Sequence, residues 1–179
     1  MNRRPAAAIG CGLLIALALG GCAGNNSPIA SLPGFNEPLA TADAKLNVEA
    51  AQAVISTYRT NNGLGPVSID PELMKLAEEQ ARAMAQRDKL DHSAWRPFQQ
   101  RIQQSSFDAS VAVENIAAGY DTLAEAFSGW RASPEHRANM LNPAVTKMGI
   151  AAVYAPKSKY KVFWSLILAK RDDQRRAER

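Results

Sequence analysis

Two histidines and one glutamate are the residues of this chain best suited to metal, acid–base or ligand chemistry. The 179-residue sequence contains only two histidines. His92 stands in Leu-Asp-His-Ser, Glu114 in Val-Glu-Asn-Ile, and His136 in Ser-Pro-Glu-His-Arg. Imidazoles and a carboxylate can bind zinc or another divalent metal, move protons, or hydrogen-bond a polar ligand. Each of these chemistries requires that the three side chains meet in one cleft.

Three interpretations of this residue set stay open from the residues alone. It could be a structural network, in which Glu114 accepts hydrogen bonds from one imidazole and from nearby amides. It could bind a ligand, or a zinc ion with an open fourth position. It could also catalyse a reaction, with Glu114 as general base. Nucleophilic catalysis is not indicated, because His92 and Ser93 are adjacent and their side chains would point apart on an extended backbone.

Two helices are expected before the first histidine. Apolar residues at helical spacing predict a helix over residues 44–62, ended by the left-handed signal Asn-Gly. Asp70 is a predicted N-cap, with Pro71 at the first position of a second helix. That helix would place His92 just past its end. A further short helix is indicated within residues 95–107.

The next elements carry the other two candidate residues. A β-branched stretch over residues 111–116 predicts a strand bearing Glu114. Asp121 or Thr122 can cap a third helix with an apolar core face. A short fourth helix then contains His136 in its first turn, where the positive end of the helix dipole favours a neutral imidazole.

Polar residues around these elements are expected to have supporting roles. Ser133 is expected to cap the helix of His136 by accepting from free backbone amides, with Pro134 at the first helical position. Asn115 is expected to bond backbone around the cleft. Arg137 and Asn139 are expected to hold the loop before Pro143.

Two final strands complete the predicted fold, over residues 147–154 and 160–169. The second is apolar on both faces, which indicates a central strand. Helices at both ends with strands between them predict an α+β fold, a three-layer α-β-α sandwich with a small, mostly antiparallel central sheet.

The segments of His92, Glu114 and His136 are joined by the end of the first helix (Tyr-Arg-Thr-Asn-Asn-Gly-Leu), Asp-Pro-Glu-Leu, and a late Tyr-Lys-Val-Phe-Trp. In order and spacing, these segments between residues 46 and 168 resemble the CAP superfamily, whose SCP domain occurs in cysteine-rich secretory proteins, antigen 5 and pathogenesis-related 1 proteins. The resemblance implies a CAP-like sandwich with two histidines and two acidic residues in its cleft. His92, Glu114 and His136 match three of these. The second acidic residue is absent, because no Asp or Glu follows His92 before Asp108.

The N-terminus predicts export and lipid anchoring. Arg3 and Arg4 precede an apolar run at residues 9–19 that is too short to span a bilayer comfortably. Leu-Gly-Gly-Cys then resembles a bacterial lipoprotein cleavage box, so residues 1–21 are interpreted as a signal peptide and Cys22 as the lipidated residue. An ordinary signal peptide cut beyond Cys22 is the alternative. Because alanine rather than aspartate follows Cys22, an outer-membrane anchor facing the periplasm is favoured.

The remaining boundaries follow from composition. Residues 22–43 are rich in Gly, Asn, Ser, Pro and Ala and are expected to be a flexible tether. Residues 44–169 form one predicted domain, and residues 170–179 a solvated tail of mixed charge. The domain has no disulfide, because the only other cysteine is Cys11 in the signal.

Charge and motif content narrow the function classes. The 21 basic and 17 acidic residues leave 19 − 17 = +2 once Arg3 and Arg4 are removed, and the basic residues are spread out, so a nucleic-acid partner is not expected. The favoured function is a membrane-anchored binding module for a small amphiphilic, lipid, peptide or wall-derived ligand. The alternatives are a zinc-assisted hydrolase using His92, His136 and Glu114, and an envelope interaction protein whose cleft is purely structural.

Overall fold

The computed structural model describes residues 31–172. The predicted signal peptide, the lipidation site Cys22, residues 22–30 of the expected tether and residues 173–179 of the expected tail lie outside the described residues.

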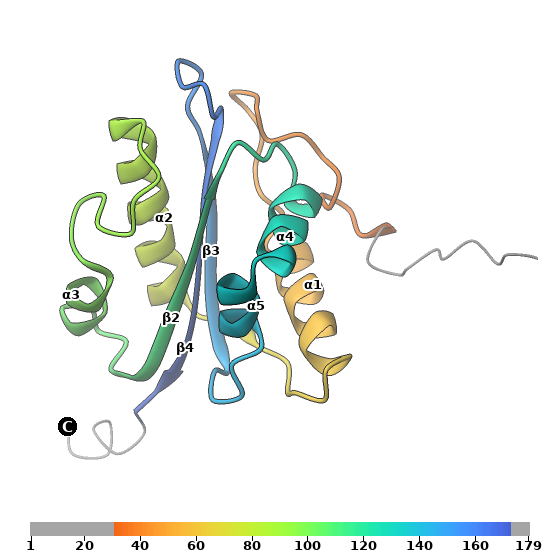
Figure 1. The fold of residues 1–179 in the computed structure, drawn as a ribbon, viewed down its shortest axis with the longest axis vertical. Helices are drawn as coiled ribbons and strands as arrows, with labels where there is room; N and C mark the ends of the chain where they lie inside the picture. Colours follow the sequence, from red (N-terminus) through yellow and green to blue (C-terminus); the bar gives the residue numbers. More distant parts are fainter. Residues whose placement is uncertain (1–30, 173–179) are drawn as a thin grey trace, which may run out of the picture.

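A four-stranded sheet forms the middle layer of the molecule, with the strand order β1-β3-β4-β2 (Figure 1). β1 pairs with β3 in parallel, and the other two pairings are antiparallel. The strands are β1 (Ser68–Ile69), β2 (Ala109–Ala118), β3 (Lys147–Tyr154) and β4 (Val162–Arg171). This mostly antiparallel sheet agrees with the predicted fold.

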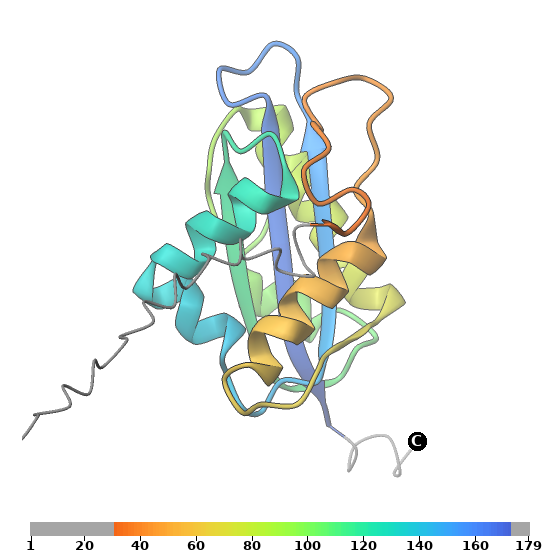
Figure 2. The same ribbon diagram turned by 90° about the vertical axis from the view of Figure 1, so that its right-hand side faces the viewer.

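Helices cover both faces of the sheet. One face carries α2 (Pro71–Arg87) and α3 (Phe98–Gln103). The opposite face carries α1 (Val48–Thr60), α4 (Leu123–Ala132) and α5 (Pro134–Met140), which lie together in front of the strands in Figure 2. The three-layer α-β-α sandwich is therefore confirmed.

β4 is an interior strand, paired with β3 on one side and β2 on the other, and its residues from Val162 to Ala169 are all buried. It begins two residues later than predicted, since Lys161 takes up a left-handed conformation with φ of 61°. It also continues to Arg171, whose guanidinium donates to the carbonyl of Phe107 at 2.9 Å and pairs with Asp70 at 2.7 Å. The prediction that a solvated tail starts at residue 170 is therefore wrong for these first residues.

Side-chain caps set where the helices begin. α1 starts at Val48 rather than at residue 44, because Asn47 accepts from the amide of Ala50. Asp70 caps α2 by accepting from the amides of Glu72 and Leu73. Thr122 rather than Asp121 caps α4, in a reciprocal capping box with Glu125.

Residues 31–43 pack against the domain, so the expected tether is corrected there. Leu39 is only 5% exposed and belongs to the hydrophobic core beneath α1 and α4. Its amide donates to the carbonyl of Asp121 at 2.7 Å, and the amide of Ala124 donates to the carbonyl of Phe35 at 2.9 Å. The composition of this segment, rich in Gly, Asn, Ser, Pro and Ala, gave no indication of these contacts.

The loop before Pro143 is held by a buried arginine of α1. Arg59 donates through Nη1 to the carbonyls of Met140 and Asn142, both at 2.8 Å, and through Nη2 to that of Val145 at 3.1 Å. Arg137 and Asn139 were predicted to hold this loop, but their side chains donate instead to Arg131 and to residues of β2.

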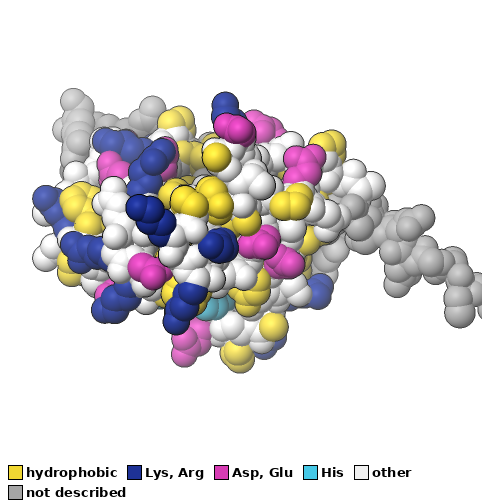
Figure 3. Space-filling model, turned by 90° about the horizontal axis from the view of Figure 1, so that it is seen from above, with side chains coloured by type: hydrophobic (Ala, Val, Ile, Leu, Met, Phe, Trp, Pro, Cys, Tyr) yellow, Lys and Arg dark blue, Asp and Glu magenta, His cyan; other side chains and the backbone are white. Residues whose placement is uncertain are grey.

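The described surface has mixed charge. Seen from above, Lys and Arg side chains lie intermingled with Asp and Glu side chains (Figure 3). Across residues 31–172, no helix is long and apolar enough to cross a membrane.

Candidate functional site

Glu114 lies at the centre of the candidate site and is buried on β2. Arg101 of α3 donates from Nη2 to both of its carboxylate oxygens, at 2.8 and 3.0 Å. Ser165 of β4 adds a longer hydroxyl bond at 3.4 Å. Because the side chains of Arg101 and Glu114 are both almost fully buried, this is an internal ion pair in which each charge compensates the other.

Arg101 also fixes the segment that carries the first histidine. Its Nη2 donates to the carbonyl of His92 at 3.1 Å, and its Nε donates to that of Arg96 at 3.2 Å. Sequence reasoning missed this residue, because it treated residues 95–107 only as a short helix. A signal was present: a buried carboxylate requires a cation or several donors, and Arg101 lies beside the apolar Phe98 and Ile102.

His92 contacts Glu114: the Nδ1 atom of the histidine lies 2.9 Å from the Oε2 atom of the glutamate. The carboxylate is paired with Arg101 and can only accept, so the Nδ1–H group of His92 is the donor. The imidazole side chain is 53% exposed. Its Nε2 atom is therefore not engaged by Glu114 and is available to a ligand.

His136 is half-buried and is the third residue of α5. Its helix is fastened to β2 by two asparagines. Asn115 donates to the carbonyl of His136 at 3.0 Å, while Asn139 donates to the side-chain oxygen of Asn115 at 2.9 Å and to the carbonyl of Glu114 at 3.2 Å. Asn115 and Asn139 thus tie the helix that carries His136 to the strand that carries Glu114.

The pKa of His136 is lowered from its ordinary value of 6.5. Burial is the main cause, because it disfavours the charged imidazolium. The neighbouring charge of His92 acts in the same direction, and Glu135 acts against it. His136 is therefore a predominantly neutral imidazole at pH 7, able to donate from one ring nitrogen and accept at the other.

The other two predicted supporting residues lie apart from this arrangement. Ser133 occupies the N-cap position of α5, but its side chain makes no cap hydrogen bond, so the predicted capping is wrong. The exposed Arg137 donates to the carbonyl of Arg131 at 3.3 Å. Neither residue therefore supports the histidine–glutamate cluster, which we define as His92, Glu114 and His136.

The donor set does not fit a zinc site built on all three residues. Both oxygens of Glu114 already accept from Arg101, and a metal ion bound there would lie next to a buried guanidinium of like charge. Within the part of the chain that the structure describes, no three His, Cys, Asp or Glu side chains are arranged to hold a metal ion.

The fold and the site together define a class of protein: an α-β-α sandwich in which a buried glutamate on β2 bonds one histidine, and a second histidine lies on a helix tied to the same strand. Residues 52–168 match the Cysteine-rich secretory protein family, CAP. This chain belongs to that family.

Relatives of known sequence or structure agree with this assignment. The uncharacterized protein YkwD of Bacillus subtilis (strain 168) is 30% identical over 128 residues, which cover 64% of this chain and 49% of that protein. The chain thus spans about half the length of this curated relative.

Two solved structures share the fold. An outer surface protein from Borrelia burgdorferi has a TM-score of 0.64 and 22% identity, covering 73% of this chain and 97% of that one. An extracellular protein containing a SCP domain from Bacillus anthracis str. Ames has a TM-score of 0.60 and 22% identity, covering 69% and 40%.

Proposed function

We propose that this protein is an exported, lipid-anchored binding module whose histidine–glutamate cluster binds a small ligand through uncharged hydroxyl or amide groups. Amphiphiles, peptides and wall-derived fragments all carry such groups. The observation that carries the proposal is the hydrogen bond by which Glu114, itself paired with Arg101, holds a half-exposed His92, with a largely neutral His136 within electrostatic reach of that imidazole.

The same observation argues against a cationic ligand and against a metal ion held by Glu114. Glu114 and Arg101 compensate each other, so the carboxylate is not free to bind a cation, while the two imidazoles offer hydrogen-bonding nitrogens. A general-base role for Glu114 is disfavoured, because its carboxylate already accepts from Arg101. The proposed ligand is therefore bound and released without a covalent step.

Export and anchoring are proposed from the N-terminal sequence. The Leu-Gly-Gly-Cys pattern ends in Cys22, whose acyl chains would hold the domain at a membrane surface. In support, the relative from Borrelia burgdorferi is described as an outer surface protein and that from Bacillus anthracis as extracellular.

The ligand proposal is tested by native mass spectrometry of the full chain, purified from its own cell envelope in mild detergent. We expect an added mass that is released on denaturation and that is lost in His92→Ala and in His136→Ala. Lys89→Ala is the matched control, since Lys89 is exposed near His92 and pairs with Asp91. Wild-type protein without an added mass, or one retained by both histidine variants, contradicts the proposal.

The anchor is tested separately by Cys22→Ser. The variant should fractionate with soluble protein, because it lacks the thiol that receives the lipid. A variant that still fractionates with membrane would show that the lipid assignment is wrong, without affecting the ligand proposal.

A further inference from the structure

β3 has an edge that its neighbour β1 covers only in part. β1 pairs with β3 at Lys147 and Met148 alone. β3 continues to Tyr154, so among the described residues the edge from Gly149 onward has no neighbouring strand on that side.

The main-chain groups of this edge point outward at alternate residues. The amide of Asp70 donates to the carbonyl of Met148 at 2.9 Å, and the amide of Ile150 donates outward to the sulphur of Met74 at 3.3 Å. By the same alternation, Ala152 directs its amide and carbonyl away from β4. Within residues 31–172 these two groups have no protein partner.

On the opposite edge of the sheet, formed by β2, side chains donate to the outward carbonyls. On β2, the carbonyl of Glu114 accepts from Asn139, and the carbonyl of Ile116 accepts from the indole of Trp130 at 3.3 Å. Natural proteins usually cover or charge their exposed strand edges, because an uncovered edge is a template for another chain. The edge of β3 has instead the small apolar sequence Ile-Ala-Ala-Val, without proline or charge.

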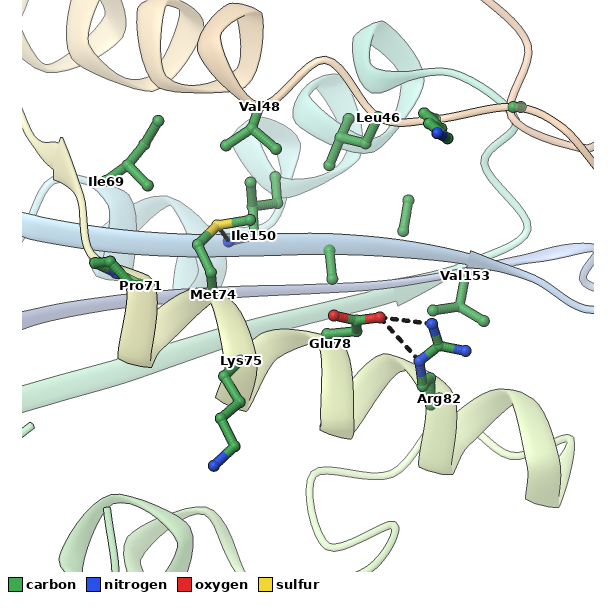
Figure 4. A pocket seen from close by; sticks show the side chains of 14 residues that line it. Leu46, Val48, Ile69, Pro71, Met74, Lys75, Glu78, Arg82, Ile150 and Val153 are labelled. Atoms are coloured by element: carbon green, nitrogen blue, oxygen red, sulfur yellow. Dashed lines mark hydrogen bonds and ion pairs between the residues drawn. The ribbon is translucent and has the colours of Figure 1, made fainter. Parts of the chain in front are cut away.

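This edge forms the floor of a groove of about 760 Å³. Figure 4 shows β3 between two walls, one formed by the segment leading into α1 and the other by α2. The groove contains none of the three cluster residues. Its lining is largely apolar, with Leu46, Val48, Ile69, Met74, Ile150 and Val153.

The charged residues at the rim of the groove are mostly positive, although the side chain of Lys75 extends away from β3 in Figure 4. Glu78 is already paired with Arg82 one helical turn away. Together with Lys45 and Lys75, the four lining charges sum to 3 − 1 = +2. An occupant with acidic residues beside its apolar ones would complement this rim.

We propose that the edge of β3 binds an extended acidic–apolar peptide segment of a partner protein as an added strand. An extended chain can pair with successive outward amide and carbonyl groups of the edge, which a compact ligand cannot do. A second folded copy fits poorly, because its own β3 lies between the same two walls and the walls would collide before the edges met. This inference is independent of the proposed ligand site.

The test uses the full chain and a labelled peptide, acetyl-Asp-Val-Ser-Val-Ser-Val-Asp-amide, against the same peptide N-methylated at alternate residues. We expect saturable binding of the first peptide and at least about tenfold weaker binding of the second, which lacks the main-chain donors of one edge. Amide exchange at Ala152 and Tyr154 should slow about tenfold when the peptide is at ten times its Kd.

Two proline variants make the test specific to this edge. Ala152→Pro removes the outward amide of β3 and should weaken binding at least about tenfold. Ala112→Pro is the matched control, because it places the same change at the outer edge of β2. The proposal is overturned by equal binding of both peptides, by loss only in Ala112→Pro, by no saturation up to about 1 mM peptide, or by edge protection that depends on protein dimerisation.

Discussion

At the scale of single residues, Arg101 explains how a buried glutamate can lie at the centre of this site. Its guanidinium compensates the charge of Glu114 and at the same time holds the backbone of His92. The pair therefore links α3, β2 and the loop of the first histidine. One side chain stabilises the domain and also orients the proposed ligand-binding imidazole.

Arg101→Met should be strongly destabilising, because it leaves Glu114 buried without its cation. Removing one partner of a buried ion pair costs about 3–5 kcal/mol. The free energy of unfolding, measured by urea denaturation, should fall by about that amount. Arg82→Met is the control: it breaks an exposed pair and should change the free energy by no more than about 1 kcal/mol.

A double variant separates charge from packing. Glu114→Gln added to Arg101→Met should recover about 1 kcal/mol or more, since the uncompensated carboxylate is gone. If the double variant is as unstable as the sum of the two single variants, the two side chains do not depend on each other and the ion pair is not the source of the loss.

The sequence identified the site residues that stand in local motifs and missed those whose role depends on long-range contacts. His92, Glu114 and His136 each stand in a recognisable local motif. Arg101 has no such motif, because its partner lies thirteen residues away on another element and the contact depends on where α3 packs. Arg59 is similar, with three of its four carbonyl partners more than eighty residues away. Local patterns reveal candidates, whereas long-range compensation of charge becomes visible only in the fold.

At the scale of elements, the N-caps of α4 and α5 differ in their side-chain hydrogen bonds. Thr122 accepts from the amide of Glu125, and Glu125 accepts in return from the amide of Thr122. Ser133 has a suitable residue type and backbone conformation at the start of α5, but no side-chain cap bond. Residue type alone therefore does not establish a cap.

Thr122→Ala should lower the free energy of unfolding by about 1 kcal/mol, because it removes the cap of a helix that carries buried core residues. Ser133→Ala should change it by less than about 0.5 kcal/mol, in line with a position that makes no such bond. Thermal and urea unfolding of the two variants side by side provide the measurement. Equal losses would contradict the difference seen between the two caps.

Strand prediction succeeded where the pattern was local. Residues 147–154 were predicted as a strand and form β3 with those bounds. β1 was not predicted, because two residues carry no periodicity and pair only through the presence of β3. The shortness of β1 has a consequence that no sequence pattern shows, namely the uncovered edge of β3.

At the scale of the whole molecule, residues 31–172 are held together without cysteines. Apolar packing on both faces of the sheet replaces them. On the face of α1 and α4, Trp130 and Trp164 meet edge to face with ring centroids 6.3 Å apart. The same cluster includes Leu39, so the segment before α1 belongs to the core and is more than a connection to the N-terminus.

Leu39→Ala should therefore destabilise the whole domain, although Leu39 lies in a segment with the composition of a linker. Replacing a buried leucine by alanine costs about 2–5 kcal/mol, since apolar contacts are lost and a cavity remains. Leu90→Ala makes the same chemical change at a side chain that is 46% exposed and should cost less than about 1 kcal/mol. Urea unfolding of both variants decides the matter: if Leu39→Ala is no more harmful than Leu90→Ala, residues 31–43 act as a tether after all.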